Sequence, residues 1–217
     1  METQAAQRRS GEGPSRSLSE RAYQHIRGDI LRGRLAVGTV VGESALAEEL
    51  GISKTPVRQA LQLLRGEGLL QVGARRQLVV RGFSPEHRQE IVDVRQALEA
   101  LAVRGAAERM TLDDIDHLRL LLIRQKRAAD AEREDDFIEL DEEFHLRMAA
   151  GAAMPVVERL LRQLRGFVRV MHIGTTRPRG YLTHVLAEHT EIVNALEARD
   201  SEQAAEALRE HLRRSDY

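Results

Sequence analysis

The sequence predicts a mostly α-helical protein in which an N-terminal winged helix-turn-helix domain precedes an antiparallel all-helical bundle. Three observations predict this fold. Two short helical patterns meet at Gly51 and lead into a basic hairpin, and the pattern after Ser84 is helical throughout. Aromatic residues make up only 3% of the 217 residues, whereas charged residues make up 31%. The length favours two domains, which we expect at residues 18–82 and 83–217.

The composition excludes several classes of protein. Cysteine is absent, which excludes disulfides and thiolate metal sites and suits a reducing compartment. No apolar run approaches the length of a membrane span. Residues 1–17 mix arginine, glycine, proline and serine without the apolar core of a signal peptide, so we expect a disordered basic tail there. We therefore expect a cytoplasmic protein without a membrane partner.

The charge is distributed unevenly along the chain. Residues 1–81 contain 13 basic and 8 acidic residues, a net charge of +5, whereas the remainder contains 20 basic and 26 acidic residues, a net charge of −6. A basic N-terminal third indicates a module that faces a polyanion.

The N-terminal module has the order of elements of a helix-turn-helix. A helical pattern begins at Leu18 and stops at Gly33, and a short extended stretch follows it. A compact helix at residues 43–50 ends at Gly51, which supplies the tight turn. Ser53 is expected to cap the next helix by accepting a backbone N–H, and Pro56 fits its first turn.

The second of these helices has the properties of a recognition helix. Its inward positions are apolar, so Lys54, Thr55 and Arg58 project from the N-terminal half, which is the half presented to bases and phosphates in the major groove.

Residues 69–72 and 78–80 are predicted to pair as a wing, whose Arg75 and Arg76 would reach a phosphate or the minor groove. The alternative is a small helical domain with a simple cap and solvated arginines, but the complete order of elements favours a DNA-binding domain.

These residues resemble the GntR family of bacterial regulators. The resemblance is carried by Ile30-Leu31-Arg32-Gly33-Arg34-Leu35 with Gly38, by residues 43–50, by Gly51-Ile52-Ser53-Lys54-Thr55-Pro56-Val57-Arg58-Gln59-Ala60-Leu61, and by Gly66-Glu67-Gly68-Leu69. It implies that the residues contacting DNA are Ser53, Lys54, Thr55 and Arg58, with Ser44, Arg75 and Arg76 as weaker candidates. Gln77 departs from the family pattern, which usually has glycine after the arginine pair.

The C-terminal module is predicted to be a bundle of about six helices without a strand. Ser84 and Pro85 are suited to begin its first helix. Breaks are expected at residues 105–111, 130–135, 151–155 and 174–180, with a short turn at Asp200.

Four potential metal ligands point into this bundle. In the helix over residues 135–150, Asp141 lies inside the apolar stripe and His145 lies at its edge, while three glutamates lie opposite. Being four residues apart, Asp141 and His145 can share one ion. His189 and His211 face inward from two later helices. One inward histidine alone is more often a hydrogen-bonded core residue, but four such residues together favour a metal site.

One carboxylate and three imidazoles suit zinc best, with nickel possible and manganese less favoured because it prefers oxygen ligands.

Arg95 is a further inward polar residue, on the first helix of the bundle. A guanidinium that faces a core is costly unless a partner meets it. One interpretation is a salt bridge to Glu99, to Asp141 or to another buried acid. The other is a cavity that receives the carboxylate of an effector, for which a planar bidentate donor is well shaped.

The C-terminal module resembles the FCD sensor domain of one large GntR subfamily. The resemblance is carried by Val94-Arg95-Gln96-Ala97-Leu98-Glu99, Leu140-Asp141-Glu142-Glu143-Phe144-His145, Glu188-His189 and Glu210-His211-Leu212. It implies that Asp141, His145, His189 and His211 are metal ligands and that Arg95 lines an effector pocket beside them. Met154 stands where the family often has asparagine.

The sequence therefore leads to one main hypothesis and two rivals. The hypothesis is a DNA-binding transcriptional regulator, a repressor rather than an enzyme, in which a small carboxylate bound at a divalent metal and Arg95 alters the spacing of two DNA-binding heads. A homodimer on a pseudo-palindromic double-stranded operator is implied. The rivals are a metal-dependent hydrolase that activates water and a constitutive DNA binder with a structural metal.

Overall fold

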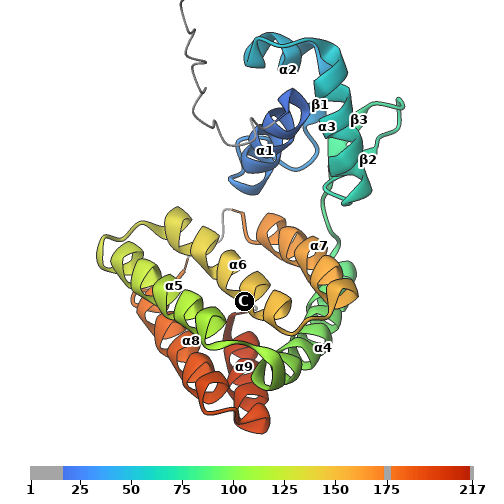
Figure 1. Cartoon of the computed structure of the whole chain (residues 1–217). Helices are drawn as coiled ribbons and strands as arrows, with labels where there is room; N and C mark the ends of the chain where they lie inside the picture. The colour runs from blue at the N-terminus through green and yellow to red at the C-terminus, as the bar shows by residue number, and fades with distance from the viewer. Residues whose placement is uncertain (1–16, 174–176, 216–217) are drawn as a thin grey trace, which may run out of the picture.

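The computed structural model describes residues 17–173 and 177–215, which form a small α/β domain above a bundle of helices (Figure 1). The basic tail expected at residues 1–17 lies outside the described residues except for Ser17, whose hydroxyl accepts the backbone N–H of Glu20 and caps the first helix. In the described part of the chain, no helix is long and apolar enough to cross a membrane.

The N-terminal domain is a winged helix-turn-helix, as the sequence predicts. Its sheet is antiparallel with strand order β1-β3-β2, in which Val40 pairs with Val79 and Leu70 pairs with Val80. The elements are α1 (Leu18–Leu31), β1 (Val40–Val41), α2 (Glu43–Leu50), α3 (Lys54–Gly66), β2 (Leu70–Val72) and β3 (Leu78–Val80).

The turn between α2 and α3 follows the sequence prediction, with one correction. Gly51 ends α2 with a left-handed backbone (φ 64°) that glycine adopts at little cost. Ser53 occupies the N-cap position of α3 in an extended conformation, but within the described structure its side chain makes no capping hydrogen bond. The expectation that Ser53 caps the helix through its hydroxyl is therefore wrong.

The wing closes without the glycine that the family pattern has after the arginine pair. The Gly73 backbone N–H donates to the Gln77 carbonyl, and the Arg76 N–H donates to the Gly73 carbonyl. Arg76 takes the left-handed conformation (φ 59°) that the tight loop requires. The conformation that favours glycine thus falls on Arg76 rather than on Gln77.

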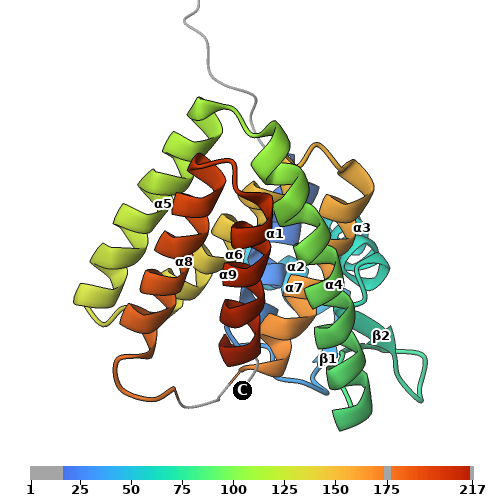
Figure 2. The same cartoon turned by 90° about the horizontal axis from the view of Figure 1, so that it is seen from below.

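The C-terminal domain is the expected helical bundle, in which α8 and α9 lie side by side (Figure 2). Its helices are α4 (Pro85–Arg109), α5 (Leu112–Asp130), α6 (Glu134–Gly151), α7 (Pro155–Met171), α8 (Tyr181–Glu197) and α9 (Ser201–Ser215). Ser84 caps α4 by accepting the His87 N–H, and Pro85 follows at the first helical position.

The break expected at residues 105–111 is wrong in its first part, because α4 continues to Arg109. Gly105 serves close packing there instead of ending the helix. A Cβ atom at Gly105 would lie 3.1 Å from Met154 Cε and 3.3 Å from Ala152 Cβ, in the turn that joins α6 to α7. The missing side chain lets that turn approach α4.

Helix α7 belongs to the bundle but also completes the hydrophobic core of the N-terminal domain. Phe167 and Val170 are buried in the same cluster as Ile26 and Leu61 of α1 and α3. The Phe167 ring lies 4.9 Å from the ring of Phe83 between their centroids. The two domains therefore share apolar contacts through α7.

Replacing Phe167 with alanine should destabilise the protein by about 3–5 kcal/mol, the usual cost of removing a buried aromatic ring. The loss should appear as a lower urea midpoint for the N-terminal domain. Leu160→Ala on the same helix is the control, because Leu160 is 41% exposed. Equal midpoints for the two variants would contradict the role of Phe167 as a shared core residue.

Candidate functional site

The residues proposed to contact DNA lie on the exposed surface of the N-terminal domain. Lys54, Thr55 and Arg58 are exposed on the N-terminal half of α3. Helix α2, which precedes them, lies at the end of the domain away from the bundle (Figure 1). The remaining candidates, Ser44, Ser53, Arg75 and Arg76, are also exposed.

One of these side chains is already held by a neighbour. The Arg58 guanidinium pairs with the Glu43 carboxylate at the start of α2, with 2.7 Å between Nη2 and Oε2. Glu43 thereby holds Arg58 across the turn, and DNA would compete with this exposed ion pair. Sequence reasoning missed Glu43.

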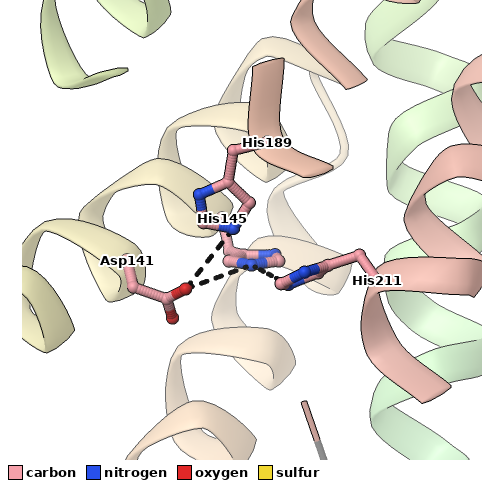
Figure 3. Close-up of side chains that lie close together, drawn as sticks. All are labelled: Asp141, His145, His189 and His211. Carbon is pink, nitrogen blue, oxygen red and sulfur yellow. Dashed lines mark hydrogen bonds and ion pairs between the residues drawn. The ribbon is translucent and has the colours of Figure 1, made fainter. Parts of the chain in front are cut away.

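The four predicted metal ligands come together in the middle of the bundle (Figure 3). Asp141 and His145 lie on α6, His189 on α8 and His211 on α9. One donor atom from each lies within 4.8 Å of all the others. The His145 and His211 Nε2 atoms are 3.2 Å apart, and the His189 Nε2 atom is 3.4 Å from Asp141 Oδ1.

Each histidine is oriented by an acceptor at its other ring nitrogen. His145 Nδ1 lies 2.6 Å from Glu99 Oε2 and His211 Nδ1 lies 2.9 Å from Glu188 Oε2, while His189 Nδ1 lies 3.0 Å from Gln125 Oε1. Because these oxygens accept hydrogen bonds, they assign the N–H of each ring to Nδ1. Each Nε2 atom then carries an unprotonated lone pair that faces the centre of the cluster. This is the arrangement seen when histidine binds a metal.

Sequence reasoning missed the partners Gln125 and Glu188, and considered Glu99 only as a partner of Arg95. Gln125 is fully buried on α5, and its signal was a polar residue among the apolar inward positions of that helix. The signal for Glu188 was its position directly before His189.

Arg165 on α7 is the largest omission. It is buried, and its guanidinium donates to Glu99 Oε1 at 3.0 Å and to Asp141 Oδ2. This contact fixes the Asp141 carboxylate so that its other oxygen faces the three histidines. Arg165 lies on the inner face of α7, four residues after the buried Leu161, and this spacing was the available signal.

The electrostatics of the site keep Asp141, His145 and His189 in the protonation states that a metal requires. Burial, followed by the nearby Arg165 charge, lowers the pKa of His145 to about 4. Burial and repulsion from His211 lower the pKa of His189 well below its usual range. Although burial opposes ionisation, Arg165 and His145 hold the pKa of Asp141 well below its ordinary value. Near neutral pH His145 and His189 are neutral and Asp141 is ionised.

The cluster fits a cation, because its polar atoms do not all find hydrogen-bond partners within the cluster. Within the described residues, His189 Nε2 is buried and has no hydrogen-bond partner. The lone pairs of His145 and His211 face one another, and Asp141 contributes an acceptor oxygen. Four acceptors converge without a donor between them, which is unfavourable in a buried site unless a cation lies among them.

A second cluster in the described part of the chain joins His25, Asp29 and Glu49 between α1 and α2. His25 and Glu49 are exposed, and Asp29 is held by Arg34. Ordinary surface ion pairs account for this cluster.

A cavity of about 190 Å³ opens beside the buried cluster. Its lining includes Arg95, Asp141, Arg165, Tyr181 and His211. Arg95 is 3% exposed, and its Nε atom lies 3.6 Å from Glu99 Oε1. Both interpretations of Arg95 thus have a structural counterpart, since it forms the salt bridge and also faces the cavity.

Comparison with known proteins agrees with the fold. The family model described as "Bacterial regulatory proteins, gntR family" matches residues 18–80, and the model described as "FCD domain" matches residues 90–214. The chain is 29% identical over 202 residues to the HTH-type transcriptional repressor RspR of Escherichia coli (strain K12), covering 92% of this chain and 87% of that protein.

Two further similarities extend over most of the chain. An uncharacterized HTH-type transcriptional regulator in an unstable DNA locus of Streptomyces ambofaciens is 31% identical over 196 residues, which cover 88% of this chain and 80% of that protein. The solved structure of E. coli McbR/YncC has a TM-score of 0.82 and 25% identity, covering 92% of this chain and 95% of that chain.

The winged helix-turn-helix and the names of these relatives define a DNA-binding transcriptional regulator. The chain belongs to the GntR family, in the subfamily whose C-terminal domain is an FCD domain.

The metal-free protein, kept in a chelator, should lose stability as the pH falls from about 6.5 towards 4. The folded-state pKa values of His145 and His189 are lowered, so the unfolded chain binds more protons in this window. Each of the two histidines should contribute a slope of about 1.4 kcal/mol per pH unit. Urea unfolding at a series of pH values measures the slope.

The His145→Gln variant should flatten this slope, whereas His117→Gln, at an exposed position on α5, should not. An unchanged slope in His145→Gln would show that the buried ring does not carry the effect.

Proposed function

We propose that this chain is a metal- and effector-responsive repressor whose FCD domain controls the DNA affinity of its winged helix-turn-helix. One observation supports the proposal most strongly: inside the bundle and beside a cavity, potential ligand atoms of four side chains come close together. These are Asp141, His145, His189 and His211. The domains that we assign to the two roles are residues 18–82 and 83–217.

Zinc is the metal that the donor set favours, with nickel possible and manganese less suited. A bound ion would supply positive charge and a coordination position to an anionic effector. The protein contributes the orientation of its ligands. Glu99, Gln125 and Glu188 hold the three imidazole rings, and Arg165 holds the carboxylate of Asp141.

The proposed effector is a small carboxylate that enters the cavity beside the metal ligands. Arg95 supports this assignment because its buried guanidinium lines the cavity. A volume of about 190 Å³ suits a compact acid.

The proposed DNA contacts are Lys54, Thr55 and Arg58 on α3, with Ser53 at its start. The weaker candidates are Ser44 on α2 and Arg75 and Arg76 in the wing. Since one recognition helix contacts one half-site, we propose a homodimer on a pseudo-palindromic operator. The effector acts by its different affinity for two arrangements of the paired heads.

The charges around the cluster support a sensor over a hydrolase. A hydrolase needs a carboxylate that is not a ligand and that accepts a proton from water. Glu99 is the buried carboxylate next to His145, but it is paired with Arg165. Its pKa is well below the usual range, because His145 and Arg165 outweigh the effect of burial. Such a carboxylate is a weak base.

His189→Ala should reduce zinc affinity more than Gln125→Ala does, because the first change removes a ligand and the second removes its orienting partner. The loss of an orienting partner typically costs about 10–100-fold in metal affinity. Competition against a chromophoric chelator measures both values. His117→Ala on α5 is the control, since His117 is exposed and lies on the helix that carries Gln125. A wild-type chain that binds no zinc, nickel or manganese would overturn the metal assignment.

Arg58→Ala should weaken operator binding by about 1–3 kcal/mol and relax specificity at one base pair if Arg58 contacts a base. If Lys54 contacts a phosphate, Lys54→Ala should weaken binding to all duplexes alike and reduce the salt slope by about one. Fluorescence anisotropy with duplexes selected from a random pool measures both effects.

Arg124→Ala is the matched control for these DNA-binding variants, because Arg124 is a half-exposed arginine on α5 of the bundle. DNA affinity that responds equally to Arg58→Ala and Arg124→Ala would contradict the proposed recognition helix.

A further inference from the structure

The cavity beside the metal ligands is not enclosed by the FCD domain alone. Leu31 and Arg32, at the end of α1, line it together with Asp141 and Arg165. Helix α1 belongs to the DNA-binding domain and lies over the face of the bundle that α6 and α7 form (Figure 1). One wall of the cavity is therefore made by the DNA-binding domain.

The end of α1 is held closely against the end of α7. Arg169 Nε donates to the Leu31 carbonyl at 3.3 Å, and Arg169 itself lines the cavity. Gly33 follows with a left-handed backbone (φ 73°), and a Cβ atom there would lie 2.7 Å from Ile173 Cγ2. Ile173 also lines the cavity. The wall is thus a packed junction.

Two positive charges at this end of the cavity, those of Arg32 and Arg177, pair with exposed acidic side chains. Arg32 pairs with Glu139 of α6, and their side chains are 37% and 45% exposed. Arg177 pairs with Glu134, which is 48% exposed. Exposed ion pairs of this kind contribute little free energy. An anionic ligand inside the cavity can therefore replace Glu139 as the partner of Arg32.

Glu139 itself does not line the cavity, whereas Arg32 does. The two members of this ion pair thus have different relations to a ligand. Arg32 faces both the cavity and Glu139, whereas Glu139 pairs with Arg32 and, at 3.7 Å, with Nη2 of Arg169.

We propose that the end of α1 is part of the effector site and that Arg32 binds an anionic group of the carboxylate effector directly. This inference rests on the proposed function, in which the cavity receives the effector. The ligand then contacts the DNA-binding domain itself. Because α1 packs against α3 in one hydrophobic core, a shift of Arg32 towards the ligand acts on the helix that carries Lys54 and Arg58.

The test compares Arg32→Gln with Glu139→Gln in the zinc-loaded full-length chain. Both variants remove the ion pair between Arg32 and Glu139, and Glu139→Gln also removes the pair with Arg169. Only Arg32→Gln removes a residue that lines the cavity. Calorimetric titration with acetate, succinate and citrate should show binding weakened about tenfold or more in Arg32→Gln for every acid that the wild type binds. Glu139→Gln should bind that acid as tightly as the wild type or more tightly.

Two results would overturn the inference. One is unchanged acid affinity in Arg32→Gln. The other is an equal loss of acid affinity in both variants, which would mean that Arg32 only joins the two domains through its ion pair with Glu139. Zinc affinity and the thermal midpoint of Arg32→Gln are the controls for an intact site.

Failure of the proposed function is a separate result. If the zinc-loaded wild type binds none of the three acids, the cavity is not a carboxylate site. The proposed effector and the role of Arg32 are then both wrong. Loss of binding in Arg32→Gln alone, with zinc affinity unchanged, supports both.

Discussion

A buried guanidinium is the constraint on which the centre of the molecule depends. Arg165 donates to Glu99 and to Asp141, so one side chain of α7 fixes carboxylates on α4 and α6. A buried arginine is costly without such partners, and without it the buried Glu99 and the half-buried Asp141 would repel each other. Glu99 in turn orients His145, and Asp141 directs its remaining oxygen at the histidines. One charge network thus connects three helices.

The same helices also hold the DNA-binding domain. Two residues after Arg165, Phe167 enters the hydrophobic core of that domain. On α6, half-buried Glu142 follows Asp141 directly and pairs with Arg27 of α1 at 3.0 Å. Helix α6 therefore carries two of the predicted metal ligands and also contacts α1, and helix α7 carries Arg165 and also a core residue of the DNA-binding domain. The packing itself links the buried cluster to the domain that binds DNA.

Tertiary packing also overrides local sequence rules at particular positions. Gly105 predicted a helix end, but α4 passes through it, because a turn of the chain packs against the space that a side chain would fill. Ser53 predicted a hydroxyl cap, but it occupies the N-cap position of α3 without a capping hydrogen bond from its side chain. In the wing the left-handed conformation falls on Arg76. Each of these residues is compatible with the backbone conformation at its position. What it does there depends on segments distant in the sequence, which the local pattern does not describe.

The sequence by itself determined the two folds, the order of their elements and the inward direction of Asp141, His145, His189 and His211. Helical periodicity fixes where a side chain points relative to its own helix, and that information is local. Only the tertiary structure decided which groups meet. Glu99 reaches His145, Gln125 reaches His189, and Arg165 reaches Asp141 across segments far apart in the chain. The rotation and crossing of packed helices set these distances, and they depend on the side chains of all the helices at once.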